Sequence, residues 1–195
     1  MRFDSGPFGC SVDPATGNLA VTNYIGRSSS PGNVAIYAQA KGTAKFYSTP
    51  IYYVYFCGYD DKGNLYVDGK TNDEAFAFAE LRKHGSTFTS ITLNEKVYFP
   101  GGVQWDGKYV TVGDQEYDDR EASAIYQTTG SGGKVVGTTL LSSAQDVIGY
   151  WIDGKTVVGA DTALNDVEFY KYPKGGSATK TLTGFNEPVS VAVSR

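Results

Sequence analysis

The stretch that decides the fold is Tyr59-Asp60-Asp61-Lys62-Gly63-Asn64-Leu65-Tyr66-Val67-Asp68. Gly63 and Asn64 favour the positive-φ turn that joins two antiparallel strands. The residues that follow, 65–67, are typical of a strand. The stretch therefore predicts the end of one strand, a tight turn, and a second strand that closes at the carboxylate of Asp68.

The same pattern occurs four times along the chain. Each predicted inner strand ends at an aspartate, and these aspartates stand 47, 46 and 47 residues apart, at Asp13, Asp60, Asp106 and Asp153. A fifth copy brings Ser194 to this position 41 residues later. A proline stands six residues before the position in three copies, at Pro7, Pro100 and Pro188. Repeats of this length are typical of propellers and solenoids.

Each repeat continues in the same order. The second strand closes at an Asn or Asp, and a third strand with alternating apolar and aromatic residues leads through a Gly-rich turn to a fourth. Four antiparallel strands per repeat, without helical periodicity, predict an all-β fold: a β-propeller of four-stranded antiparallel blades. A β-sandwich would also give many short strands, but it would not repeat side-chain types at a fixed step.

The repeat count predicts four blades plus one extra inner strand, in a single or partial propeller domain that spans 1–195. We expect the blades at about 7–53, 54–99, 100–146 and 147–187, with the extra inner strand at 188–195. Such a count does not close a ring. We therefore expect either the C-terminal part of a longer propeller or a homo-oligomer that associates through its open ring ends.

Composition excludes several classes of partner. Hydrophobic residues make up 41% of the 195 residues and charged residues 19%, as in a globular protein. The net charge of −4, without a run of Lys or Arg, argues against a nucleic-acid partner. No apolar run approaches about 18 residues, so we expect no membrane helix. The start, Met1 to Gly6, has no signal-like apolar region, and the compartment stays open.

Three motifs carry a resemblance to a known family: Asp-x-x-Gly-Asn-Leu-Tyr-Val at 60–67, Val-x-Phe-Tyr-x-Tyr-Pro-x-Gly-Gly at 167–176 and Pro-Val-x-Val-Ala-Val at 188–193. With them the chain resembles the NHL-type β-propellers, particularly bacterial secreted members, over nearly its whole length. The resemblance implies a ring that usually has six blades, and an extracellular or periplasmic location. It is specific for fold and says little about function, because propellers host both enzymes and scaffolds.

An acidic loop is the strongest local candidate for a metal site. Asp114, Glu116 and Asp118 match the first three ligand positions of a calcium loop. The glycine at the sixth position and the bidentate glutamate at the twelfth are replaced by Asp119 and Ile125. We therefore expect weak Ca²⁺ binding at most, with a solvated acidic loop as the simpler interpretation, and no other cofactor.

The residues that close the second strands raise another metal hypothesis, because gluconolactonase-type propellers hold a metal with central Asp, Asn and Glu side chains. A catalytic site needs an asymmetric set of residues. A residue repeated in every blade usually bonds the backbone amides of its own turn. We therefore interpret these positions as structural: Asn23, Asp68, Asp114 and Asp161.

Candidate ligand-binding residues come from one face of the propeller. The crossovers between blades and the loops between second and third strands share that face, which is where the resembled family usually binds. Tyr52, Tyr53 and Tyr98 are aromatic residues at its mouth that could stack on a sugar or hold a peptide, and Asp146 lies on a crossover. They predict a site for a small molecule, a glycan or a protein.

Other reactive residues give little support for catalysis. His84 is the only histidine, which excludes Ser-His-Asp and multi-histidine sites within this chain, and we expect it in a surface turn. Cys10 and Cys57 occupy the position that apolar or aromatic residues fill in other repeats, so we expect two buried thiols, with a disulfide as the alternative.

Two classes of function remain. The first is a non-catalytic binding or scaffold module without catalytic residues, which the lack of a nucleophile–base pair favours. The alternative is a metal-dependent lactonase or hydrolase of the gluconolactonase-like type. Its ligands would come from Asp114, Glu116, Asp146 or Glu187.

Overall fold

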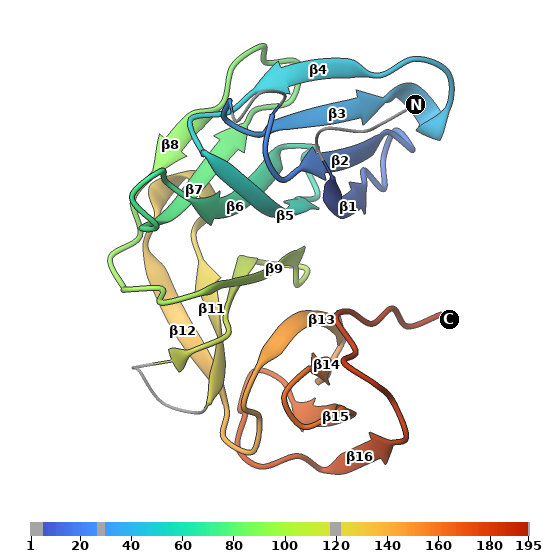
Figure 1. Cartoon of the computed structure of the whole chain (residues 1–195), viewed down its shortest axis with the longest axis vertical. Helices are drawn as coiled ribbons and strands as arrows, with labels where there is room; N and C mark the ends of the chain where they lie inside the picture. The colour runs from blue at the N-terminus through green and yellow to red at the C-terminus, as the bar shows by residue number, and fades with distance from the viewer. Residues whose placement is uncertain (1–5, 27–29, 118–121, 195) are drawn as a thin grey trace.

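The architecture is the all-β fold that the repeats predict. The structure, a computed structural model, describes residues 6–26, 30–117 and 122–194. Four separate four-stranded antiparallel sheets follow one another as the blades of a β-propeller (Figure 1). Within the described residues, the helical elements are single 3₁₀ turns such as η2 (Ala38–Ala40) and η4 (Gly130–Gly132).

Each blade is built from four consecutive strands. The first contains β1 (Pro7–Val12), β2 (Leu19–Asn23), β3 (Asn33–Tyr37) and β4 (Lys45–Ser48). The second contains β5 (Tyr53–Tyr59), β6 (Leu65–Lys70), β7 (Phe76–Leu81) and β8 (Thr89–Ile91). The third contains β9 (Pro100–Trp105), β10 (Val110–Asp114), β11 (Ser123–Thr128) and β12 (Val135–Leu141). The fourth contains β13 (Val147–Asp153), β14 (Thr156–Asp161), β15 (Asp166–Lys171) and β16 (Lys180–Thr183).

The aspartate after the inner strand fixes the first turn of the blade. In the second blade, the backbone N–H groups of Lys62 and Asn64 donate to Asp60 Oδ1 at 2.9 and 2.8 Å. The Asn64 side chain donates to Asp60 Oδ2 at 2.8 Å. Gly63 takes φ 82°, which a side chain would disfavour. The turn itself runs from Asp60 to Gly63, whose N–H donates to the Asp60 carbonyl oxygen at 3.2 Å, and Asn64 accepts the Asp60 N–H across the hairpin at 3.0 Å. The predicted positive φ is therefore right for Gly63 and does not extend to Asn64.

The carboxylate at the predicted end of the second strand holds the preceding crossover or inner strand, although in the second blade β6 continues past Asp68 to Lys70. Asp68 Oδ1 accepts the backbone N–H of Phe56 at 2.9 Å. Asp114 Oδ1 accepts the N–H of Phe99, also at 2.9 Å. These positions serve backbone amides, as the structural interpretation predicts, although these two amides lie outside the residues' own turns.

The core lies in three layers, each between two consecutive blades. The inner strands contact one another in series from β1 to β5, β9 and β13. The sheets follow an arc in Figure 1, with the first and fourth blades at its two ends. Buried side chains that represent the three layers are Val34 and Leu65, then Phe78 and Val112, then Ile125 and Tyr170.

The joints between inner strands differ in chemistry at one repeat position, two residues before the aspartate. Ser11 Oγ accepts the N–H of Tyr59 at 3.4 Å. Gln104 bridges to the next inner strand more firmly, since its Oε1 accepts the N–H of Ile152 at 2.8 Å. At Gly58 the backbones of the inner strands β5 and β9 are in direct contact, since a Cβ on Gly58 would stand 2.6 Å from the carbonyl oxygen of Val103.

The open ends of the arc leave large apolar side chains exposed. On the first blade these include Phe8 and Val12 of the inner strand β1. On the fourth blade and the segment after it they include Trp151, Phe185 and Val189. These apolar side chains of the repeat stay exposed to solvent because no further blade packs against the end of the arc.

The position of Cys10 corrects one prediction. Cys57 is buried, as expected, but Cys10 is exposed, because it lies on the end blade whose inner strand has a neighbour on one side only. Both cysteines are free thiols, so the disulfide alternative does not hold here.

The predicted fifth inner strand is also corrected. Residues 184–194 form no strand, since they pair with no strand of the described residues. The segment nevertheless lies against β13. A Cβ placed on Gly149 would stand 2.8 Å from the carbonyl oxygen of Val189 and 3.0 Å from the Cα of Ser190.

The first two blades meet in the same way. A Cβ on Gly9 would stand 2.7 Å from the carbonyl oxygen of Tyr55 and 2.9 Å from the Cα of Phe56. Gly9 and Gly149 are equivalent in the repeat, as are Phe56 and Ser190. The terminal segment thus occupies the place of a fifth inner strand without joining a sheet, and it is held by side-chain bonds such as that from the Thr162 hydroxyl to the Pro188 carbonyl oxygen at 2.9 Å.

Candidate functional site

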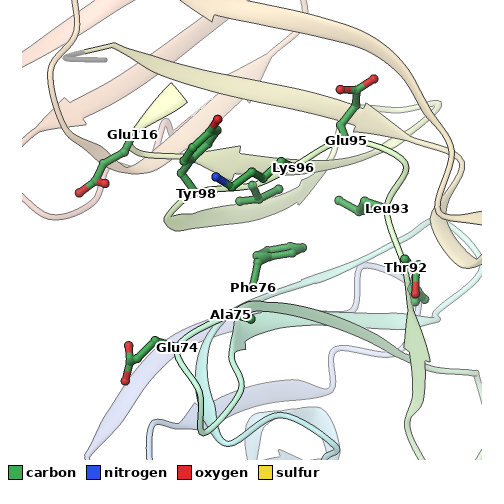
Figure 2. Close-up of a pocket in the computed structure, with 11 residues that line it drawn as sticks. Glu74, Ala75, Phe76, Thr92, Leu93, Glu95, Lys96, Tyr98 and Glu116 are labelled. Carbon is green, nitrogen blue, oxygen red and sulfur yellow. The ribbon is translucent and has the colours of Figure 1, made fainter. Parts of the chain in front are cut away.

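A cleft lies between the second and third blades. It has a volume of about 510 Å³ and opens to solvent. Figure 2 shows Phe76 and Tyr98 on its opposite sides. Three carboxylates from different segments line it, those of Glu74, Glu95 and Glu116. The cleft therefore combines aromatic surface with negative charge.

Its second-blade side is set by the turn between β6 and β7. The N–H of Glu74 donates to the carbonyl oxygen of Thr71 at 3.1 Å, and Glu74 takes φ 62°. Its carboxylate stands 3.4 Å from Lys70 Nζ, which also lies 3.7 Å from the centre of the Phe99 ring. The Lys70 ammonium therefore already contacts the Glu74 carboxylate and the Phe99 ring. Phe76, which also lines the cleft, is the first residue of β7.

The third-blade side is the crossover from β8 to β9. The buried Asp114 carboxylate accepts the N–H of Tyr98 at 3.1 Å, and the Tyr126 hydroxyl donates to the carbonyl oxygen of Lys96 at the same distance. These two hydrogen bonds hold the crossover onto the third blade. Lys96 Nζ then lies 3.6 Å from the centre of the Tyr98 ring, within range of a cation–π contact.

Tyr52 and Tyr53 lie elsewhere, in an aromatic cluster between the first and second blades. Their rings meet edge-on with centroids 4.7 Å apart. Tyr53 stacks on Tyr24 at 5.2 Å, and Tyr24 stacks on Tyr55 at 5.5 Å. The structure therefore brings Tyr52 and Tyr53 together and places Tyr98 on a different surface. Sequence reasoning named no role for Tyr24, which directly follows the strand-closing position.

Asp146 lies on the crossover between the third and fourth blades. Burial raises the pKa of its carboxyl, and the negative charges of Asp161 and Glu116 raise it further. Asp146 thus belongs to an acidic environment and not to the aromatic cluster of Tyr52 and Tyr53.

The predicted calcium loop is only partly described. Asp114 is fully buried and bonded to backbone amides, and burial raises its pKa. Glu116 is exposed and lines the cleft. Asp118 lies outside the described residues. Weak calcium binding by this loop remains a prediction.

A second acidic group was not predicted. One carboxylate oxygen from each of Asp161, Asp166 and Glu168 lies within 4.8 Å of the others, and all three residues are buried. Burial raises the pKa of Asp166 and of Glu168. The alternation of Asp166 and Glu168 along one strand is the signal that could have found them, since such residues share a face.

The comparison with protein families assigns the chain. A model described as a family of unknown function (DUF6454) matches residues 51–186, well over half of the sequence. The chain belongs to the DUF6454 family. Its matched region runs from the start of the second blade to the end of the fourth.

Solved structures share the fold of this DUF6454 chain at low sequence identity. A chain of the nidogen/laminin complex has a TM-score of 0.53 and 11% identity, covering 93% of this chain and 81% of that one. Glutaminyl cyclase from Myxococcus xanthus has a TM-score of 0.59 and 9% identity, covering 91% of this chain and 70% of that one. Both likenesses show a propeller-type fold alone.

Two further findings concern curated proteins and membrane-spanning helices. No curated protein sequence matches the chain. Among the described residues there is no helix with the length and apolarity to cross a membrane.

Proposed function

We propose that this DUF6454 chain is a non-catalytic binding module of the NHL type, and that its cleft takes an extended peptide segment that carries basic side chains. The observation that carries the proposal is the lining of the cleft. Three glutamates, Glu74, Glu95 and Glu116, line the cleft together with the aromatic residues Phe76 and Tyr98, and Lys96 is the one cation among the described lining residues.

The Tyr98 ring supports a cationic ligand. Lys96 already places its ammonium over this ring, which indicates that the ring face attracts positive charge. An arginine or lysine of a peptide could reach the Phe76 ring opposite, with the nearby carboxylates around it. A glycan would also stack on these rings, but it would leave the charges of Glu95 and Glu116 unused, whereas the Glu74 carboxylate is already paired with Lys70.

The chemistry of the cleft favours binding over catalysis. Its described lining contains no histidine, cysteine or serine. His84 lies exposed in the turn between β7 and β8. Nucleophilic catalysis needs a nucleophile hydrogen-bonded to a base, and in the described lining the threonine hydroxyl, that of Thr92, makes no such bond.

The proposal is tested by calorimetry with three probes: a capped Gly-Arg-Gly-Arg-Gly peptide, its Glu-containing counterpart and cellohexaose. We expect the arginine peptide to bind. Glu116→Gln should weaken it by up to about fivefold, as expected for one exposed ion pair. Glu187→Gln is the matched control outside the cleft. Preference for cellohexaose would reject the ligand class, and binding of no probe would reject the cleft.

We further propose that a second copy of this chain covers the open ends of the arc. Phe8 and Val12 at one end, and Phe185 and Val189 at the other, are the observation that favours it. Contiguous apolar surface normally marks an interface. Light scattering should show concentration-dependent dimers or larger species, which Val12→Ser weakens and Leu140→Ser does not. Val12 is the better probe, because the Phe8 ring also stacks on Tyr55 of the second blade at 5.1 Å. A monodisperse species of 21.0 kDa at all concentrations would reject this proposal.

The metal-dependent lactonase stays as the alternative. The acidic environment of Asp146 favours it, because the negative charges of Asp161 and Glu116 raise the pKa of this carboxyl. The assay is opening of a lactone ring with and without added Ca²⁺ or Mn²⁺. Metal-dependent turnover that is lost in Asp146→Asn would replace the binding proposal.

A further inference from the structure

The buried acidic group of the fourth blade is formed by one β-hairpin. Asp161 ends β14, and Asp166 begins β15 and is its register partner. Glu168 lies two residues further along β15, so the three side chains share one face of the sheet. Their exposed fractions are 0%, 8% and 4%.

The group is specific to this blade. The residue that closes the second strand is paired with Asn33 in the first blade, Phe78 in the second and Ala124 in the third. In the fourth blade the partner is a carboxylate, Asp166. The structural role of the repeat needs no acid there, because three blades form the same hairpin without one. An asymmetric set points to a role beyond the repeat.

Two of the carboxylates are oriented by hydrogen bonds. Asp161 Oδ2 accepts the N–H of Gln145 at 2.7 Å, and its Oδ1 accepts the N–H of Leu164 at 3.0 Å. Glu168 Oε1 accepts the Ser143 hydroxyl at 3.2 Å, and its Oε2 accepts the Tyr170 hydroxyl. Such outer contacts fix the orientation of metal-binding carboxylates.

The third carboxylate is different. Asp166 is 92% buried, taking its exposed fraction of 8%, and its Oδ1 has no hydrogen-bond partner. This orphan oxygen belongs to a carboxylate that reaches toward the oxygens of Asp161 and Glu168. A buried carboxylate oxygen without a partner costs free energy unless a cation or a proton neutralises it.

No positive side chain supplies that charge. Across the described residues, the ion pairs are Lys70 with Glu74 and Arg82 with Glu80, both in the second blade. Breaking or omitting one partner of a buried pair leaves an uncompensated charge. Three carboxylates gathered without Lys or Arg therefore call for a different counter-charge.

We propose that Asp161, Asp166 and Glu168 bind a divalent cation, with calcium as the favoured ion, between the third and fourth blades. The donor set is oxygen alone, which suits hard cations and excludes a thiolate or imidazole site. Calcium tolerates irregular coordination by several carboxylates, whereas magnesium keeps most of its waters. The proposal does not depend on the peptide cleft.

The position of the group gives the cation a structural role. Gln145 and Ser143, which bond Asp161 and Glu168, belong to the crossover from the third blade into β13. The carboxylates themselves belong to the hairpin of the fourth blade. A cation would therefore tie the crossover to the hairpin and hold the fourth blade onto the third.

Terbium luminescence provides the test, because Tb³⁺ replaces Ca²⁺ and is excited by a nearby tyrosine. Tyr170 bonds Glu168 directly, so a bound ion would lie beside a sensitiser. We expect saturable Tb³⁺ emission that Ca²⁺ displaces. Asp166→Asn should lower the affinity at least about tenfold, since removal of outer-shell groups alone has that effect.

Two control variants separate this site from others. Glu116→Gln removes a carboxylate of the predicted acidic loop, and Asp68→Asn removes a second buried carboxylate that has an orphan oxygen among the described residues. Both should keep the emission. Loss of emission in Glu116→Gln with retention in Asp166→Asn would overturn the proposal in favour of the loop.

The melting temperature gives an independent readout that does not need luminescence. Ca²⁺ should raise it in the wild type and EDTA should reverse the rise. If Asp166→Asn folds poorly, Asp166→Glu keeps the charge and should retain a Ca²⁺-dependent shift. Unchanged melting of the wild type with Ca²⁺, together with unsaturable Tb³⁺ emission, would show that a proton neutralises the group and would overturn the proposal.

Discussion

The inner strands of the first two blades occupy the same repeat positions but differ in burial. Phe8 and Tyr55 both stand five residues before the turn aspartate, yet their exposed fractions are 52% and 8%. Val12 and Tyr59 stand one residue before it, with exposed fractions of 55% and 9%. The repeat decides where a side chain points, and the neighbouring blade decides whether it is covered.

The largest expected effect contrasts the cores of the two blades. Phe78→Ala should lower the free energy of unfolding by about 3–5 kcal/mol, because Phe78 is 2% exposed between blades. Phe46→Ala in the first blade removes a ring that is 63% exposed and should change it by less than about 0.5 kcal/mol. Urea denaturation measures both, and similar losses would contradict the contrast.

A smaller effect concerns the joints between inner strands. Gly58→Ala should cost about 1–3 kcal/mol of unfolding free energy, because the new methyl would stand 2.6 Å from the carbonyl oxygen of Val103. The matched variant in the first blade, Ser11→Ala, loses a 3.4 Å hydrogen bond and should cost less than about 1 kcal/mol. Equal costs would mean that the second and third blades can move apart freely.

The pH dependence of stability should differ at the strand-closing position. Burial raises the pKa of Asp68 well above its ordinary value, and the hydrogen bond from Phe56 opposes this only in part. A raised folded-state pKa adds stability that is present below the unfolded pKa of about 3.9 and is lost as pH rises through the folded value.

Asp68→Asn removes that titration. The stability of the variant relative to wild type should therefore improve as pH rises from about 4 to 8. Chemical denaturation at several pH values measures this change. Asn23 fills the equivalent position in the first blade and is less buried, so Asn23→Asp should introduce a weaker pH dependence. A pH-independent difference for Asp68→Asn would show that Asp68 ionises normally.

The last prediction concerns the reactivity of the two thiols. Cys10 should react quickly with a thiol reagent in the native protein, because it is exposed. Cys57 should react only on unfolding, because burial raises the pKa of its thiol and suppresses the reactive thiolate. Mass spectrometry after brief labelling distinguishes the two. Equal labelling would mean that the first blade separates readily from the second.

The blade order could be predicted from the sequence because the signals are local. The Asp60 turn and the alternation in each strand depend on neighbours only a few residues away, and they gave all four sheets. The exposure of Cys10 and the missing strand at 188–194 could not be predicted in this way. Both depend on whether another blade supplies a covering face or a hydrogen-bonding partner.

The candidate site was less accessible to sequence reasoning. The sequence predicts Tyr98 as a ligand-binding residue and Glu116 as a metal ligand, and in the structure both residues line the same cleft. Glu74, Phe76 and Glu95 were missed, because the cleft is lined by residues of two different blades that only the fold brings together. Asp166 was missed because its importance lies in the register that sets it opposite Asp161.

The serial arrangement of the core has a consequence for how the molecule comes apart. Each apolar layer is shared by two blades, so no blade holds a complete core of its own. Loss of the fourth blade would uncover Ile125 and Leu141 on the third, and loss of the third would uncover both of its neighbours. Unfolding should therefore run inward from the ends of the arc, as a chain of nearest-neighbour steps. Amide hydrogens on β5 and β9, which each have an inner strand on both sides, should exchange last.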